Sequence, residues 1–184
     1  NNLAASDLEN FACHAALFFK KAGAASDDDT RIICPQTSIL SWLHYATDKF
    51  ISDFENDLNS LNFIERQSMG GRAGMGVGDP TFCLQRCIEN ETDMGRRLLI
   101  LQLDILQFFD RIHWALIVKA LQKRNIPLEF SELILQLICR VKIYIQIPGS
   151  RAVMVDRGKG LITGAPLCVR LSRWVIEDLM HQAW

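Results

Sequence analysis

Asp104 is the residue of this chain whose position is best suited to chemistry. It follows RLLILQL (97–103), a nearly continuous apolar run typical of a strand covered on both faces. A carboxylate at the end of such a strand is anchored by buried neighbours yet reaches solvent. It can therefore hold Mg²⁺ through one oxygen while a substrate phosphate supplies others. Phe109 follows five residues later, and its ring would contact a sugar of the same substrate. Without such a function, Asp104 would simply anchor a loop and Phe109 would be a core residue.

The cysteines and histidines give no comparable pattern. The six cysteines contain no CxxC pair, and Cys83 with Cys87 has only the spacing of one helical face. This usage predicts buried, reduced thiols in an intracellular protein. The four histidines show neither HxxxH nor HExxH spacing, which argues against zinc.

Helices and strands must alternate around Asp104 to position it. Asp79 and Pro80 form an N-cap and N1 pair, Asp110 can cap a second helix, and Asn125 suits its C′ position. Apolar periodicity predicts helices over 80–94, 111–124, 127–139 and about 167–179, a strand over 97–104, and a hairpin of 141–147 with 151–156. We expect 97–104 to be buried between helices 80–94 and 111–124.

The N-terminal part, residues 1–67, is predicted to be a helical segment. Apolar residues recur at helical spacing over 1–21 and again over 38–61, where Thr37 or Ser38 is the expected N-cap. The whole chain is therefore predicted to be α+β, with a small, mainly antiparallel sheet packed on helices.

Composition and charge restrict the function. The chain has 184 residues, 49% hydrophobic and 22% charged, which fits one folded domain rather than a disordered chain. Residues 1–79 carry 6 basic and 11 acidic groups, whereas residues 80–184 carry 14 and 10, so a phosphate-binding surface would lie in the C-terminal part. Neither a secretory signal nor an apolar run of the ~18 residues that span a bilayer is evident. We expect an intracellular protein, cytoplasmic or nuclear, with no membrane partner.

Three blocks of sequence resemble reverse transcriptases of non-LTR (LINE-type) retrotransposons. LQLDILQFFDRIHWALIVKALQKRNIP (101–127) is similar to their first catalytic motif, LDIxxAFDxVxWxxLxxxLxxxGIP. RGKGLITGAPLCVRLSRWVIEDLM (157–180) resembles their RGVRQGxPLSPxLF motif, and GGRAGMGVGDPTFCLQRCIE (70–89) resembles a segment of their fingers. The resemblance implies partial polymerase fingers and palm over 68–184, with a faint, fingers-like likeness over 1–67.

The resemblance implies a role for each matching residue. Asp104, beside the carbonyl of Ile105, would be the metal-binding aspartate of a centre in which two Mg²⁺ ions lie roughly 3.5–4 Å apart. Phe109 would be the steric gate that excludes a 2′-hydroxyl, and Asp110 would cap its helix. The turn of Thr163, Gly164 and Pro166 would support the template and the incoming deoxynucleoside triphosphate, with Arg72 near the phosphates. The implied partners are an RNA template, a DNA primer and the triphosphate.

The chain also departs from the family pattern. Gly76 and Asp79 stand where the family has basic residues, and Arg170 lies on a helix face that is normally apolar. The F/YxDD hairpin that supplies the other metal ligands does not occur, and we expect a fragment truncated before it. Because one carboxylate cannot hold two Mg²⁺ ions, we expect weak Mg²⁺ binding and no polymerase activity from these residues.

Two other classes of function stay open. A non-catalytic nucleic-acid binder would use basic residues of the C-terminal part: Arg96, Arg97, Arg111, Lys119, Lys123, Arg124, Lys142 and Arg151. An unrelated Mg²⁺-binding α/β domain of the phosphotransfer type would want a second acidic residue beside Asp104, where Gln102 and Ile105 stand instead.

Overall fold

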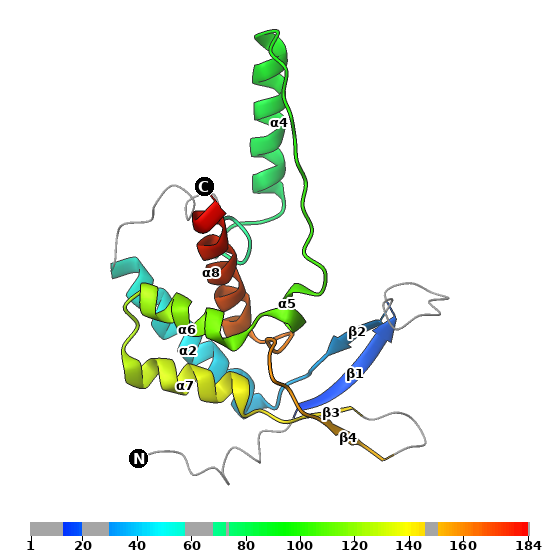
Figure 1. Ribbon diagram of the computed structural model, residues 1–184, viewed down its shortest axis with the longest axis vertical. Coiled ribbons are helices and arrows are strands. Elements are labelled where there is room, and N and C mark those ends of the chain that lie inside the picture. The colour runs from blue at the N-terminus through cyan, green and yellow to red at the C-terminus, as the bar shows by residue number, and fades with distance from the viewer. Residues whose placement is uncertain (1–12, 20–29, 58–67, 73, 146–150, 184) are drawn as a thin grey trace.

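The computed structural model describes residues 13–19, 30–57, 68–72, 74–145 and 151–183. Figure 1 shows a group of helices on one side, a small sheet extending from it, and one helix that projects away from both. The helices and strands are thus segregated, and the predicted α+β class is confirmed.

Within these described residues the sheet has four strands, in the order β2-β1-β3-β4. Their bounds are β1 Cys13–Phe19, β2 Thr30–Ile33, β3 Ile143–Ile145 and β4 Val153–Val155. β1 pairs antiparallel with β2 and parallel with β3, and β3 pairs antiparallel with β4 in a register that sets Tyr144 opposite Met154. Two of the three pairings are antiparallel, so the predictions of a mainly antiparallel sheet and of a hairpin within 141–156 are confirmed.

The strand β1 corrects one prediction. Residues 1–21 were expected to be helical, but their described part, Cys13–Phe19, is a strand between β2 and β3; the rest of that segment lies outside the described residues. Over so short a stretch, small and apolar residues fit the spacing of a helix as well as that of a strand. Pairing with two neighbouring strands then outweighs the local propensity for a helix.

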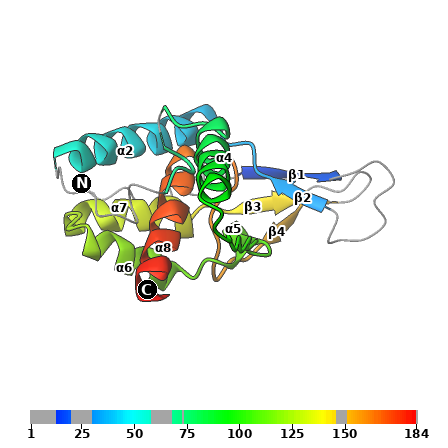
Figure 2. The same ribbon diagram turned by 90° about the horizontal axis from the view of Figure 1, so that it is seen from above.

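Four long helices enclose the core. They are α2 (Ser38–Asp57), α6 (Trp114–Lys123), α7 (Leu128–Cys139) and α8 (Pro166–Ala183). α8 contacts both α2 and α6, and its Trp174 is among the largest fully buried side chains. Figure 2 shows α8 between α2 on one side and α6 on the other. The Thr37 hydroxyl accepts a hydrogen bond from Leu40 N at 3.4 Å, and Asn125 has φ +52°, so the predicted N-cap and C′ residue are confirmed.

The helix α4 (Gly78–Asp93) has no buried residue and forms the projecting arm. Its bounds confirm a helix over about 80–94, although Asp79 lies inside it and accepts a hydrogen bond from Gly76 N at 2.6 Å. The exposure of α4 also corrects the cysteine prediction, because Cys83 and Cys87 lie on it and are exposed.

The segment 97–104 is not a buried strand, and this prediction was wrong. Every residue from 92 to 107 is exposed, and no residue of 97–104 belongs to the sheet. Gly95, with φ +65°, turns the chain after α4 and sends it back beside the projecting helix, away from the core (Figure 1). An apolar run indicates that its side chains are suited to burial, but it does not specify which other segment packs against them.

Candidate functional site

The short helix α5 (Phe108–Arg111) and the segment 160–163 form the centre of the candidate site. The backbone carbonyl of Phe109 accepts a hydrogen bond from Leu161 N at 2.8 Å, and Gly160 N donates to the Ile112 carbonyl at 2.8 Å. Trp114 Nε1 donates to the Gly160 carbonyl, also at 2.8 Å. These bonds join the two sequence blocks that contain Phe109 and the 163–166 turn.

Gly160 permits this close approach. Its φ is +90°, and an added Cβ would lie 3.0 Å from the backbone oxygen of Asp110 and 3.2 Å from its Cα. A side chain at this position would therefore meet both an unfavourable backbone conformation and a fixed neighbouring backbone.

A pocket of 210 Å³ opens beside this junction. Its lining combines apolar side chains, among them those of the β3–β4 hairpin, with polar and charged residues from the junction and from the segments next to it. The latter are Cys34, Asp110, Arg157, Lys159 and Thr163. Thr163 is hydrogen-bonded to Cys34, which lies between β2 and α2. The pocket thus joins the sheet, α5 and the turn before α8.

The buried thiols near this pocket are not nucleophiles at neutral pH. Burial raises the pKa of Cys34, against the opposing effects of Arg157 and Thr163. Burial also raises the pKa of Cys13 to about 11 and that of Cys168 to about 12. Since the thiolate is the reactive form, these cysteines act as small core residues.

Asp104 and Ile105 lie on the exposed segment that leads into α5, and Ile105 is half exposed. Asp104 reaches solvent, as expected, but no strand holds it. Phe109 is half-buried against the core, with its ring in an edge contact with Phe108 at 6.2 Å between centroids. The structure therefore brings Phe109 and Thr163 to one junction and leaves Asp104 on the arm that enters it.

The remaining predicted site residues take different positions. Gly164, with φ +97°, and Pro166 are exposed at the start of α8. Arg72 lies against α8 instead, with its guanidinium 3.8 Å from Glu177 Oε1. Asp110 is within α5 and is not the cap of the following helix, because His113 Nδ1 accepts the capping bond from Ala115 N. Predicting an Asp cap was wrong here because the chain makes an extra short turn before α6.

The donor set around Asp104 does not fit a two-ion centre. It offers one carboxylate and the neighbouring Ile105 carbonyl, and two Mg²⁺ ions need shared carboxylates. Among the residues that the structure describes, no group of three or more His, Cys, Asp or Glu side chains could hold a metal ion.

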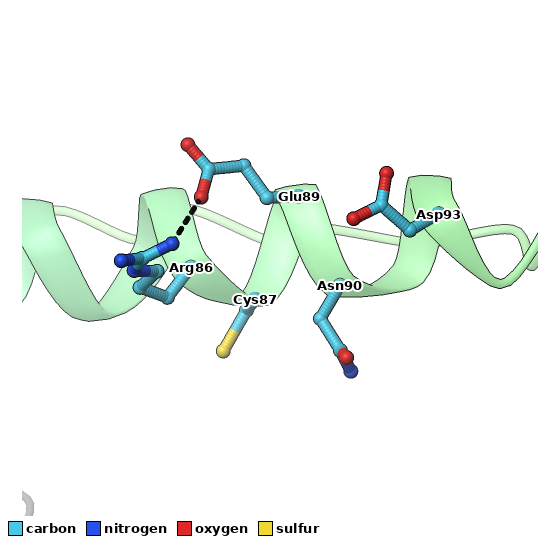
Figure 3. Close-up of a pocket in the computed structure, with 5 residues that line it drawn as sticks. All are labelled: Arg86, Cys87, Glu89, Asn90 and Asp93. Atoms are coloured by element: carbon cyan, nitrogen blue, oxygen red, sulfur yellow. Dashed lines mark hydrogen bonds and ion pairs between the residues drawn. The ribbon is translucent and has the colours of Figure 1, made fainter.

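A second pocket, of 470 Å³, lies on α4, but it is no enclosed site. All its lining residues, including Arg86, Glu89 and Asp93, belong to that one helix. Figure 3 shows their side chains spreading from the helix surface, with Arg86 and Glu89 joined by an ion pair of 3.1 Å. A single helix supplies no opposing wall to hold a substrate.

A buried ionic cluster on α8 was not predicted from the sequence. Arg124 and Arg173 both lie within 3.4 Å of Glu177, which is 2% exposed, and Arg72 approaches the same carboxylate. Lys123 and Arg124, two of the basic residues that a nucleic-acid binder was expected to use, are ion-paired with α8 instead. Lys123 Nζ, for example, lies 2.8 Å from Asp178. Helical spacing could have flagged only Arg173 with Glu177, because the other partners are distant in sequence.

No protein-family model matches the chain, and no curated protein matches it. Of the helices in the described residues, none is long and apolar enough to cross a membrane.

Proposed function

We propose that this chain is a degenerate reverse transcriptase of the non-LTR type, derived from an enzyme that made DNA on an RNA template. What supports the proposal, besides the three sequence blocks, is the 2.8 Å hydrogen bond between Leu161 N and the Phe109 carbonyl. It joins the first and second of the resembling motifs, as nucleotide binding requires, because a sugar gate and a template-supporting turn must converge on one nucleotide.

The proposal includes a loss of catalysis. Phosphoryl transfer depends on electrostatic stabilisation by precisely held metal ions, and Asp104 with Ile105 gives too few ligands. The chain is expected to retain weak Mg²⁺ binding at Asp104 and weak binding of deoxynucleoside triphosphates beside Phe109. We expect it to act inside the cell, in the cytoplasm or nucleus.

Nucleotide binding tests the gate. Calorimetric titration of dATP and ATP into the full chain with Mg²⁺ should give tighter binding of dATP, because Phe109 would clash with the 2′-hydroxyl of ATP. Phe109→Ala should bring the two affinities together, whereas Phe82→Ala, on the arm α4, should leave the preference unchanged. Equal affinities in the wild-type chain, or no binding of either nucleotide, would contradict the proposal.

Primer extension tests the loss of catalysis separately. An RNA template with an annealed DNA primer, the four triphosphates and Mg²⁺ or Mn²⁺ should give no extended product. Extension by the wild-type chain that disappears in Asp104→Asn would show that the loss of catalysis was wrongly inferred, while leaving the family proposal intact.

A nucleic-acid-binding role without catalysis is the second candidate. Six of the basic residues noted above are exposed. Two of these, Arg96 and Lys123, are ion-paired with Glu91 and Asp178, and the other four are Arg97, Arg111, Lys119 and Arg151. If they contact phosphates, the logarithm of RNA affinity should fall linearly with the logarithm of salt concentration, and each Arg→Gln change should reduce that slope by about one. Binding without a salt dependence would exclude this role.

A further inference from the structure

The segment 97–103 carries a surface that no described residue covers. Leu99, Leu101 and Leu103 are 93%, 78% and 80% exposed, and Leu98 and Ile100 on the alternate side are about half exposed. Isolated exposed leucines are ordinary, but a contiguous apolar stretch of this kind marks a site of association.

The backbone of this segment is also unpaired. Within the described part of the chain, no backbone hydrogen bond is donated or accepted by residues 97–106. The segment extends from the end of α4 back to α5 along the projecting arm (Figure 1). Exposed N–H and C=O groups in an extended segment are a template for adding a strand from another chain.

We propose that two copies of this chain associate through 97–103, paired as antiparallel strands about a two-fold axis at Ile100. In this register Arg96 of each copy lies opposite Asp104 of the other, so both ends of the paired segment join opposite charges. Leu99 lies opposite Leu101, and Ile100 lies opposite its own copy. A two-fold arrangement of this kind closes at two chains.

The charge pattern favours a second copy as the partner, because each end of the segment can meet the opposite charge of the other copy. A one-residue shift would set Arg97 instead of Arg96 opposite Asp104, so a loss of dimers in R96D distinguishes the proposed register from the shifted one. Asp104 is exposed, and the present ion pair of Arg96 with Glu91, at 3.0 Å, is on the surface and can be exchanged. The pairing would also satisfy backbone groups that now face solvent.

Charge exchange provides the test, by sedimentation equilibrium of the full chain over a range of concentrations. The wild-type chain should be a monomer–dimer mixture. R96D and D104R each place like charges opposite one another twice per dimer, and each should weaken dimerisation by about tenfold or more. The double variant R96D/D104R should restore it. R86D, on the exposed surface of α4, is the matched control and should dimerise like the wild-type chain.

Mixing the two single variants gives the decisive arm. R96D carries acidic groups at both ends of the segment and D104R carries basic groups at both ends, so an equimolar mixture should form dimers although each variant alone does not. A monomeric wild-type chain, association that continues beyond two copies, unchanged dimerisation of the single variants, or no recovery in the mixture would each overturn the proposal.

Discussion

The guanidinium of Arg124 lies between Glu177 and Trp174. Its Nη2 is 3.0 Å from Glu177 Oε2, and its Cζ lies 4.7 Å from the centre of the Trp174 ring. One side chain at the end of α6 therefore joins a buried carboxylate and the largest core side chain of α8. Burial raises the pKa of Glu177, opposed by Arg173 and Arg124. The arginines thus stabilise a charge that burial alone would neutralise.

Glu177→Ala should destabilise the fold strongly. It would leave Arg173, which is 8% exposed, and Arg124 buried without their shared carboxylate. Removing one partner of a buried ion pair typically costs about 3–5 kcal/mol, measured as the free energy of unfolding in urea. Asp53→Ala breaks the exposed pair with Lys49 and should change that free energy by less than about 1 kcal/mol. Equal effects of the two changes would contradict the role of the cluster.

His44 should make stability depend on pH. It is fully buried on α2, neither ring nitrogen has a hydrogen-bond partner in the described structure, and burial lowers its pKa to about 4. An unfolded histidine, with a pKa of about 6.5, takes up a proton first as the pH falls. Above about pH 6.5 the neutral His44 therefore costs no stability. As the pH falls from 6.5 towards 4, the free energy of unfolding decreases by about 3 kcal/mol in total.

Urea unfolding at a series of pH values measures this loss. His44→Leu should remove the part of the pH dependence that lies between pH 6.5 and 4, whereas His113→Gln, at an exposed helix cap, should keep it. An unchanged pH profile in His44→Leu would show that other groups cause the loss.

Periodicity predicted most helices because each has a wide apolar face. α6 and α7 bury Ile117, Leu121, Ile134 and Leu137, which follow helical spacing, and α8 buries Leu167, Leu171 and Trp174. The β3–β4 hairpin was predicted from alternation and a Pro-Gly turn. Each of these patterns is local, so the sequence contains the necessary information within one element.

The failures concern partners that are distant in the chain. Cys13–Phe19 becomes a strand because β2 and β3 flank it, and 97–104 lies exposed because no described strand pairs with it. At the site, local sequence singled out Phe109 and the family resemblance singled out Thr163, but neither identified Arg157 or Lys159, which line the pocket together with Thr163. Nor could it assign Arg72 to Glu177, since that contact depends on how the 68–72 segment meets α8.

Gly160→Ala should weaken the junction of the candidate site. The positive φ costs roughly 1–2 kcal/mol for a residue with a side chain, and the Cβ would press on the Asp110 backbone at 3.0 Å. We expect a loss of at least about 2 kcal/mol in unfolding free energy. Gly158→Ala, two residues earlier, has open space around its Cβ and should be nearly neutral. An unchanged unfolding free energy in Gly160→Ala would mean that the close contact between Gly160 and the Asp110 backbone does not contribute to stability.

Arg170 departs from the apolar pattern of its helix because it binds α2. Its Nε and Nη2 donate to the two carboxylate oxygens of Asp48 at 2.6 and 3.3 Å, and both side chains are largely buried. Such a two-bond pair should give a coupling energy of about 1–3 kcal/mol. A double-mutant cycle of Asp48→Asn and Arg170→Gln, read by urea unfolding, measures it, and a coupling near zero would show that α2 and α8 are held by apolar packing alone.

Metal titration decides the chemical role proposed for Asp104. Affinity for hard cations rises with the number of charged ligands, so one carboxylate and the Ile105 carbonyl should bind Mn²⁺ only in the millimolar range or more weakly. The free Mn²⁺ signal in electron paramagnetic resonance, followed during titration into the full chain, measures this binding. Asp104→Asn should abolish saturable binding, while Asp93→Asn, another exposed carboxylate on the same arm, should preserve it. Tight binding that survives Asp104→Asn would place the metal elsewhere and remove Asp104 from the proposed site.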